Sequence, residues 1–262
     1  MQDTGVHRDT KDQFYTSPNV ARDCVDKLKA IVSDGVWIEP SAGEGVFLDL
    51  VPSAIGYDIY PKDPRIREAN FLETEIPEGC VVFGNPPFGR QSSIANKFIA
   101  HAAEKAAIIA FILPLSFSKP SMQRAFPLRF HLVSSTRLPS DCFVVNSKPY
   151  NVPCVFQIWQ RRDTDRELPT PIVASGFTFV KKSSQYDIVF RRVGVNAGKC
   201  SLPGNVSEQS HHFIRLDDGK KAGQVIAASQ IHVFPTNTTG PRSLSKQEVI
   251  EFLNSTLQDT PG

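Results

Sequence analysis

Short apolar runs alternate with amphipathic segments through the first 160 residues of the chain. Two segments repeat apolar side chains at helical spacing, and the first of them follows a Ser-Pro pair that is typical of a helix start (residues 17–31 and 94–105). Four runs are instead apolar almost throughout and short enough for buried strands (residues 36–40, 53–57, 80–84 and 106–115). Apolar strands that alternate with helices predict a parallel sheet covered on both faces.

The pattern continues to about residue 160 and then changes. Further strands are expected at 130–137 and 152–160, with a polar loop over 142–151 between them. Residues 163–171 are polar and contain Pro, as linkers often do. Short alternating runs and a closing helix capped by Ser245 follow (residues 177–180, 188–190 and 245–257).

We therefore expect an α/β protein with two parts. Residues 1–162 should form a doubly wound, mostly parallel, Rossmann-like sheet that carries the chemistry. Residues 163–262 should form a small β-rich C-terminal extension.

Composition excludes several classes of protein. Hydrophobic residues make up 40% of the chain and charged residues 21%, which is typical of a globular protein. The first ten residues contain no apolar stretch, so no secretory signal is expected, and no run is long enough to span a membrane. The five cysteines are scattered without a Cys-x-x-Cys pair, which argues against a disulfide framework and against a zinc site. We expect an intracellular protein of the cytoplasm, nucleoid or nucleus.

Charge is unevenly distributed along the chain. The net charge is only +2, yet residues 118–192 hold 12 lysines and arginines against 5 acids. A basic region suits a polyanion such as nucleic acid, because cations attract phosphates and release their counterions. An ordinary solvated surface explains the charge equally well.

The tetrapeptide Asn85-Pro86-Pro87-Phe88 carries the most specific chemistry, because it directly follows an apolar strand. Open α/β sheets bind ligands at this end of their strands. The side-chain oxygen of Asn85 and the carbonyl of Pro86 could accept hydrogen bonds from a planar amine and stabilise the positive charge that grows on its nitrogen. The prolines stiffen the turn, and Phe88 offers a ring on which an extruded base could stack. The alternative is a strand-ending turn with a buried Phe.

A second motif resembles a nucleotide-binding loop. Residues 39–45 (Glu-Pro-Ser-Ala-Gly-Glu-Gly) read as a strand-turn-helix element whose glycines let a ligand approach the backbone. Asp58 ends the next strand, where a carboxylate would either accept hydrogen bonds from ribose hydroxyls or simply cap the strand.

Along the chain, an N-terminal motif (residues 13–18, Gln-Phe-Tyr-Thr-Ser-Pro) is followed by the Gly-rich loop and then by the tetrapeptide at 85–88. In this order the motifs resemble the N6-adenine DNA methyltransferases, a branch of the class I S-adenosylmethionine-dependent family, in the gamma arrangement, which places target recognition after them. The resemblance spans about residues 13–160 and implies S-adenosylmethionine as cofactor, no metal and direct methyl transfer to adenine N6. It implies catalytic roles for Asn85, Pro86, Pro87 and Phe88. The cofactor-binding positions that it implies are Phe14, Tyr15, Thr16, Glu39, Pro40, Ala42, Gly43, Gly45, Asp58, Asn70 and Phe71. For Phe14 and Phe71 the alternative is plain core packing.

Other substrates stay open at this point. DNA is the favoured partner, no membrane partner is expected, and the oligomeric state is not predicted. Similar tetrapeptides also serve methylation of RNA adenines, including the cap-adjacent adenosine, and of glutamine amides in proteins. Beyond residue 160 the resemblance is thin, and residues 191–198 suit either phosphate contact or a hairpin edge.

Overall fold

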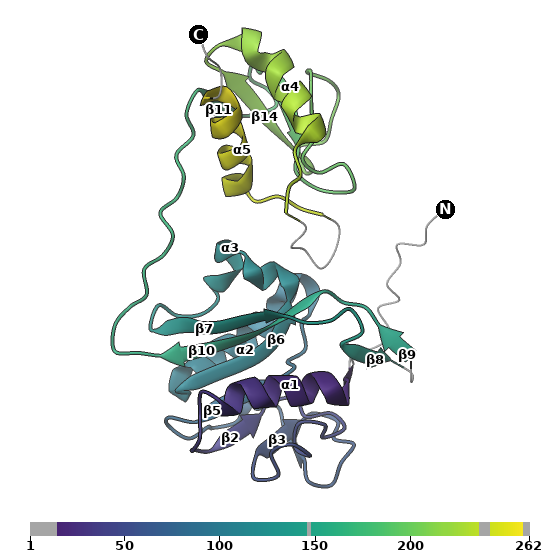
Figure 1. Ribbon diagram of the computed structural model, residues 1–262, viewed down its shortest axis with the longest axis vertical. Helices are drawn as coiled ribbons and strands as arrows, with labels where there is room; N and C mark the ends of the chain where they lie inside the picture. Colours follow the sequence, from purple (N-terminus) through teal and green to yellow (C-terminus); the bar gives the residue numbers. More distant parts are fainter. Residues whose placement is uncertain (1–14, 146–147, 236–241, 259–262) are drawn as a thin grey trace. The chain divides into compact units, whose positions relative to one another are not determined.

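The computed structural model describes residues 15–145, 148–235 and 242–258. The chain divides into two compact units, Met1–Leu168 and Pro169–Gly262, and each is considered by itself (Figure 1). Among the described residues, no helix is both long and apolar enough to cross a bilayer.

The first unit consists mainly of short strands. Its helices and strands, with η for 3-10 helices, are β1 (Tyr15–Thr16), α1 (Pro18–Lys29), β2 (Trp37–Glu39), β3 (Ile55–Asp58), β4 (Arg67–Glu68), η1 (Phe71–Glu73), β5 (Val81–Gly84), η2 (Arg90–Ser92), α2 (Ser93–Lys105), β6 (Ile108–Pro114), η3 (Leu115–Ser118), α3 (Pro120–Gln123), β7 (Phe130–Arg137), β8 (Phe143–Val145), β9 (Lys148–Tyr150) and β10 (Cys154–Arg161).

Seven of these strands form one sheet in the order β4-β3-β2-β5-β6-β10-β7. Strands β2 to β6 pair in parallel, whereas β10 runs antiparallel to both of its neighbours. The chain builds β2, β3 and β4 towards one edge and then returns to place β5 on the other side of β2. The strand order therefore reverses between β2 and β5, and such a switch point opens a crevice at the carboxyl ends of the strands.

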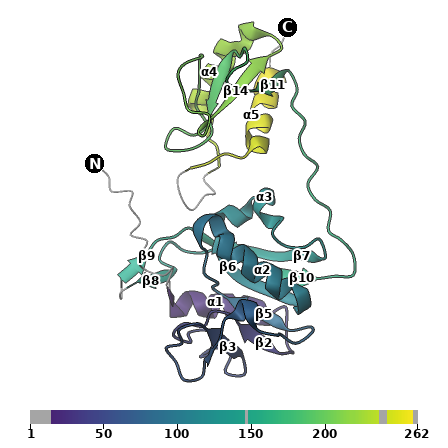
Figure 2. The same ribbon diagram turned by 180° about the vertical axis from the view of Figure 1, so that it is seen from behind.

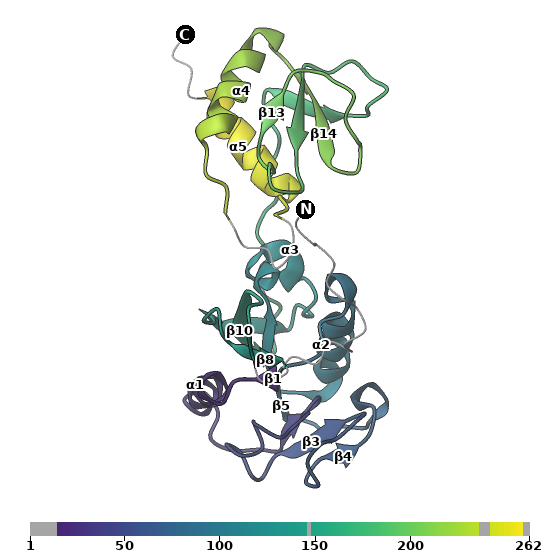
Figure 3. The same ribbon diagram turned by 90° about the vertical axis from the view of Figure 1, so that its right-hand side faces the viewer.

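Helices cover both faces of this sheet, as Figure 3 shows for α1 and α2. Alternate residues of β5 explain the layers, because Val81 and Phe83 pack with α1 whereas Val82 packs with α2. Figure 2 presents the face that α2 covers. The predicted fold class, a mostly parallel Rossmann-like sheet followed by a separate smaller β unit, is confirmed.

The segment after the Gly-rich loop differs from the strand-turn-helix prediction. Residues 46–51 make turns, with Asp49 N–H bonded to the Gly45 carbonyl at 3.0 Å and Val51 N–H to the Phe47 carbonyl at 3.0 Å. Pro52 has no N–H to continue this ladder and restricts the residue before it. No regular helix therefore forms at this place.

The predicted polar loop over 142–151 is also not a simple connector. Strands β8 and β9 pair antiparallel, and β1 adds to β8 with Tyr15 opposite Val144 and Thr16 opposite Phe143. This three-stranded sheet attaches the start of the described chain to the first unit. Sequence pattern missed it because the partner strand of β8 lies some 130 residues away along the chain.

The second unit is a four-stranded antiparallel sheet with helices packed on it. Its elements are β11 (Phe177–Val180), β12 (Ile188–Arg191), β13 (Cys200–Ser201), β14 (His211–Leu216), η4 (Gly219–Lys221), α4 (Ala222–Ile231) and α5 (Lys246–Gln258), with strand order β11-β14-β12-β13. The predicted cap of α5 is present: Glu248 N–H donates to Ser245 Oγ at 3.3 Å, and Ser245 N–H donates to Glu248 Oε2 at 2.7 Å. The sequence pattern did not predict α4, whose apolar residues are distributed all around the helix.

Arg166 fixes the end of the first unit. Its guanidinium donates to four main-chain carbonyl oxygens, those of Gln123, Phe126, Pro127 and Phe130, at 2.6–3.0 Å. It also lies 5.1 Å from the ring centre of Trp159, whose ring stacks on Phe126. These contacts hold Arg166 on the first unit, which extends to Leu168.

Replacing Arg166 by alanine should lower the free energy of unfolding of the first unit by about 2 kcal/mol, since hydrogen bonds to a charged group contribute about 1.5–3 kcal/mol each and neighbouring water replaces part of them. Both tryptophans, Trp37 and Trp159, lie in this unit, so urea denaturation followed by tryptophan fluorescence reports on it alone. The exposed Arg162, replaced by alanine, is the control and should change stability by less than about 0.5 kcal/mol. Equal midpoints for the two variants would refute this role of Arg166.

Candidate functional site at the strand switch point

Three predicted polar positions meet at the carboxyl ends of neighbouring strands. Glu39 ends β2, Asp58 ends β3, and Asn85 follows β5 directly. Since β3, β2 and β5 are adjacent and parallel, these residues lie along one edge of the sheet at its switch point.

Asp58 organises the Gly-rich loop. Its Oδ2 accepts the Gly43 N–H at 2.8 Å and its Oδ1 accepts the Tyr60 N–H at 2.8 Å. The loop is held a second time by the Ala42 N–H, which donates to the Tyr57 carbonyl at 2.9 Å. A carboxylate has about four acceptor sites, so Asp58 keeps capacity for two further donors such as ribose hydroxyls.

Glu39 is buried at the same edge, with 2% of its surface exposed. Its Oε2 has no hydrogen-bond partner among the described residues. Burial, and next the charge of Asp58, raise the pKa of this carboxyl well above its usual range. Gly84 lies against it, because a Cβ at position 84 would be 3.1 Å from Glu39 Cγ. A buried acceptor without a partner costs free energy, and a ligand that brings a donor or a cation would recover it.

The N-terminal motif lies against the Gly-rich loop. Gly43 has a φ of +53°, and a Cβ there would be 3.2 Å from Cε1 of the Tyr15 ring. Lys62 closes the arrangement: its N–H donates to the Gly43 carbonyl at 3.1 Å, and its Nζ lies 4.6 Å from the centre of the Tyr15 ring. A hydrogen bond with Tyr15 is the main cause that raises the pKa of Lys62. Thr16 is buried beside this site, and Phe14 lies outside the described residues.

One hydrogen bond joins the Gly-rich loop to the tetrapeptide Asn85-Pro86-Pro87-Phe88. Ser41 Oγ donates to the main-chain carbonyl of Asn85 at 2.9 Å. Pro86 is buried, and Asn85, Pro87 and Phe88 are half-buried. The Phe88 ring meets the Phe143 ring edge-on, with centres 6.3 Å apart, so the β8–β9 hairpin supports it from behind. One part of Phe88 is thus packed and the other reaches solvent.

The backbone just after this motif adopts unusual dihedrals. Gly89 has φ 68° and ψ 177°, a region almost confined to glycine, and Gln91 and Ser92 have φ of 54° and 61°. The Phe88 carbonyl accepts the Ile94 N–H at 3.1 Å at the start of α2. The turn thereby fixes where the tetrapeptide at 85–88 ends and α2 begins.

Replacing Gly89 by alanine should reduce turnover by about tenfold to a hundredfold. The alanine would add a strain of about 1–3 kcal/mol, and a shift of the tetrapeptide at 85–88 that relieved this strain would cause a loss of that size. The added Cβ would lie 2.5 Å from Ile94 Cγ1 and 3.0 Å from Ile94 N, so relief of the clash breaks the bond to the Phe88 carbonyl. Gly79 is the matched control, because its φ is +70° and a Cβ there meets nothing within 4 Å. Steady-state kinetics on both variants tests this; equal activity losses would show that general backbone strain is responsible.

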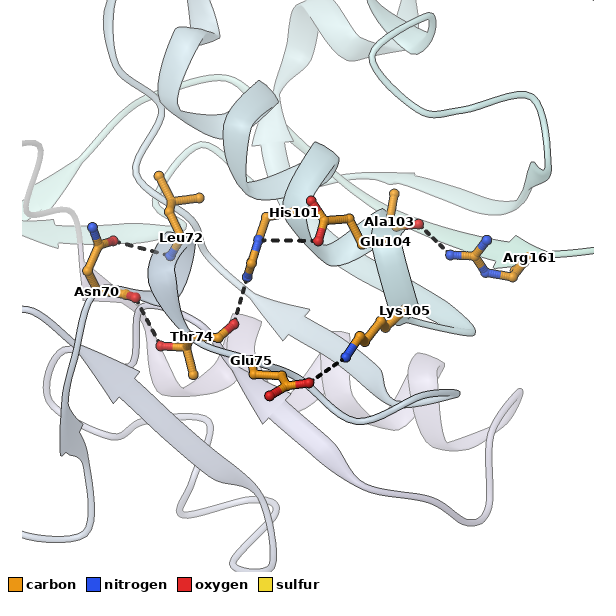
Figure 4. A network of polar contacts seen from close by, with 9 residues as sticks. All are labelled: Asn70, Leu72, Thr74, Glu75, His101, Ala103, Glu104, Lys105 and Arg161. Carbon is orange, nitrogen blue, oxygen red and sulfur yellow. Dashed lines mark hydrogen bonds and ion pairs between the residues drawn. The ribbon is translucent and has the colours of Figure 1, made fainter.

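The Asn70-Phe71 pair is divided between surface and core. Asn70 is half-buried; its Oδ1 accepts the Leu72 N–H at 3.2 Å, and its carbonyl accepts the Thr74 hydroxyl at 2.9 Å (Figure 4). Phe71 is only 1% exposed and stacks on Phe98 at 5.4 Å. The Phe71 ring is therefore part of the core, whereas the neighbouring Asn70 is only half-buried.

Figure 4 also shows how η1 is fixed to α2. His101 Nε2 makes a hydrogen bond with the Thr74 carbonyl at 2.9 Å, and Lys105 pairs with Glu75 at 2.9 Å. These contacts hold the Asn70 turn in place relative to the sheet.

The remaining predicted positions belong to the loop itself. Pro40 and Ala42 are buried, and Gly45 (φ +83°) lies against the Arg65–Asp63 ion pair, with a Cβ 3.2 Å from Arg65 Nη2. Sequence reasoning missed Ser41, Lys62 and Phe143 as site residues. Ser41 stood inside a recognised motif, but Lys62 and Phe143 gave no signal, because only the chain's return after β3 and the β8–β9 hairpin bring them there.

The donor set indicates which groups fit. No cluster of three or more His, Cys, Asp or Glu side chains able to hold a metal ion occurs within the described ranges. A carboxylate with spare acceptor sites and a buried acceptor without a partner fit an organic ligand with hydroxyls and a cationic group. That is the chemistry of a nucleoside bearing a positive charge.

No protein family and no curated protein matches the sequence. Among solved structures, the fold is similar to a candidate RNA methyltransferase from Pyrococcus horikoshii, with 17% identity and a TM-score of 0.44 over 58% of this chain and 87% of that chain. It is also similar to the M protein of the type I restriction enzyme EcoKI, with 18% identity and a TM-score of 0.43 over 56% of this chain and 44% of that chain. A candidate methyltransferase from Escherichia coli matches at 18% identity and a TM-score of 0.38, over 55% and 86% of the two chains. Because every TM-score is below 0.5, the function proposed next rests on this chain's own residues.

Proposed function

We propose that this protein transfers a methyl group from S-adenosylmethionine to the N6 amine of adenine in DNA. The hydrogen bond from Ser41 to the Asn85 carbonyl is the observation that carries the proposal, because it joins the loop suited to a nucleoside cofactor directly to the motif suited to a planar amine. Two binding sites in contact hold their ligands close together, and such proximity favours the transfer of a group from one ligand to the other.

The cofactor would lie along the edge of β2 and β3. Asp58 would accept hydrogen bonds from the ribose hydroxyls, Asn70 would lie by the adenine, and the buried Glu39 would take the cationic end. Tyr15 and Gly43 would close over the methionine portion, in keeping with their contact. When bound, S-adenosylmethionine supplies an electrophilic methyl group, so no residue has to become a covalent carrier.

At the target, the chain's residues act on the amine. Asn85 Oδ1 and the Pro86 carbonyl accept hydrogen bonds from the two N6 hydrogens, which directs the nitrogen lone pair towards the methyl group. The amine would take the methyl group directly from the bound cofactor, and the proton lost from nitrogen would pass to water. The solvent-exposed part of the Phe88 ring holds the extruded base by stacking. None of these steps calls for a metal ion.

DNA is favoured over a protein substrate by the basic stretch of residues 118–192, which suits phosphates better than a peptide. The choice between DNA and RNA is decided by experiment. Purified protein is incubated with methyl-labelled S-adenosylmethionine and with matched single-stranded DNA, duplex DNA or RNA, and the nucleosides are then separated. Label in N6-methyldeoxyadenosine is the expected result. Label only in RNA would mean that the substrate is RNA and not DNA. Label only in a glutamine-containing protein would overturn the nucleic-acid assignment.

A further inference from the structure

A hollow of about 410 Å³ lies in the second unit, where β11 and β14 neighbour each other. We call it the β11–β14 hollow; the lining residues that matter are Phe179, Lys181, Lys182, Glu208, His211 and His212. Its volume lies within the range of about 300–1,000 Å³ that is common for small-ligand sites. This is room for a single nucleotide and not for a duplex.

Two lysines line this hollow, and Lys246 and Arg192 contact residues on or beside its wall. Lys181 is exposed, whereas the Lys182 ammonium donates to the Val206 carbonyl at 2.7 Å and is thereby held at the wall. Lys246 Nζ lies 4.5 Å from the centre of the Phe179 ring. Arg192 Nη2 donates to the Gln209 carbonyl at 2.7 Å, beside the segment that carries Glu208.

Aromatic rings form the other part of the hollow. His212 meets Phe179 edge-on, with ring centres 5.2 Å apart, and both rings are half-buried. Burial, and then the charges of Arg192 and Lys246, lower the pKa of His212 to about 4. The imidazole is therefore neutral near pH 7, and lysines and Arg192 supply the positive charge. Cations next to half-buried rings are typical of sites for unpaired nucleotides.

We propose that the β11–β14 hollow binds single-stranded nucleic acid, with the backbone phosphates on Lys181, Lys182 and Lys246 and one sugar and base against Phe179 and His212. The proposal rests on the proposed function insofar as that function supplies a nucleic acid. Glu208 is the one carboxylate among the lining residues, and it would accept a hydrogen bond from an exocyclic amine of the base. An acidic peptide would satisfy the lysines but would make no use of the rings.

The chain offers a matched control for this test. Lys181-Lys182 and Lys220-Lys221 are both adjacent pairs in the second unit, and in each pair one ammonium donates to a main-chain carbonyl, Lys182 to Val206 and Lys221 to Leu257. Only the first pair lines the hollow. The double variants K181Q/K182Q and K220Q/K221Q remove the same charge from the same unit.

Fluorescence anisotropy on the full chain, with a labelled adenine-containing 12-mer and its duplex over a salt series, measures the effect. K181Q/K182Q should weaken single-strand binding by roughly tenfold at 50 mM salt and lower the slope of log K against log salt by about 1.4, since each phosphate contact on a single strand contributes about 0.7. K220Q/K221Q should bind as the parent chain does. In methyl transfer to the same 12-mer, KM should rise for K181Q/K182Q and kcat should stay within about twofold.

The outcomes separate the two proposals. Equal affinities and equal salt slopes for the two double variants would overturn the β11–β14 hollow as a binding site, even if methyl transfer is found. Poly-glutamate should displace the labelled 12-mer far less well than unlabelled 12-mer does. If both competitors displaced it equally well, the nucleic-acid proposal for the hollow would be overturned in favour of an acidic protein partner. Lysine-dependent single-strand binding without any methyl transfer would support the hollow and refute the proposed function.

Discussion

Asn85→Ala should reduce methyl transfer by at least about a hundredfold to a thousandfold. Enzymes that lose one hydrogen-bonding group that acts mainly in the transition state show losses of this size. Its side-chain oxygen is the acceptor proposed for the target amine, and position 85 directly follows the buried strand β5. The affinity for S-adenosylmethionine should stay nearly unchanged, because Asn85 contacts the Gly-rich loop through its main-chain carbonyl, which alanine retains. Single-turnover transfer of labelled methyl and calorimetric titration of the cofactor measure the two quantities separately.

Asn85→Asp is the companion variant. It keeps an acceptor oxygen at the same place and should retain more activity than Asn85→Ala, whereas a variant that merely disturbed the turn would show no such difference. Most of the parent activity remaining in Asn85→Ala would mean that the amine is held by other groups. Loss of cofactor binding in the same variant would mean that the two motifs are not separate in function.

Asp58→Asn should weaken cofactor binding by about tenfold to a hundredfold, because hydrogen bonds to a charged group are worth about 1.5–3 kcal/mol and each 1.4 kcal/mol is a factor of ten. Both carboxylate oxygens accept main-chain N–H groups, from Gly43 and Tyr60. An amide has one oxygen only, so its NH2 group must face one of these donors or turn away. The change therefore affects both the proposed ribose contacts and the shape of the Gly-rich loop.

Calorimetry with S-adenosylmethionine and with its demethylated product tests this prediction. Both ligands carry the ribose, so Asp58→Asn should weaken both by a similar factor, while kcat at saturating cofactor should fall much less than in Asn85→Ala. Asp49→Asn is the control, because Asp49 is exposed and its carboxylate pairs with Arg65. An unchanged affinity in Asp58→Asn would remove Asp58 from the cofactor site.

The two motifs differ in how the fold supports them. The Gly-rich loop is held by a charged side chain and by main-chain bonds within neighbouring strands. The Asn85 turn is held by stiff prolines, by strained residues at 89–92 and by packing of Phe88 on Phe143. Strain of this kind persists only when surrounding contacts enforce it, and it is common where a group must be kept in place for chemistry.

Much of this architecture could be predicted from the sequence alone. Strands β2, β3, β5 and β6 are apolar because both faces of each are covered, and that burial leaves a continuous apolar run in the sequence. The capping box of α5 is visible as Ser245 followed three residues later by Glu248, since capping depends on local spacing. The positions of Glu39, Asp58 and Asn85 at strand ends follow in the same way, because each stands where an apolar run stops.

Only the tertiary structure decided features that depend on contacts distant in sequence. Three such contacts join segments that share no local pattern. They are the pairing of β1 with β8, the contact of the Lys62 ammonium with Tyr15, and the hydrogen bonds from Arg166 to four main-chain carbonyls. The structure likewise placed the Phe71 ring in the core, a choice between packing and ligand contact that residue type leaves open. By itself the sequence determined which strands are buried and which polar residues end them, because burial and capping leave local patterns. The strand order, and with it the meeting of Ser41 with Asn85, depended on how the strands pair, and pairing between distant segments leaves no such pattern in a single chain.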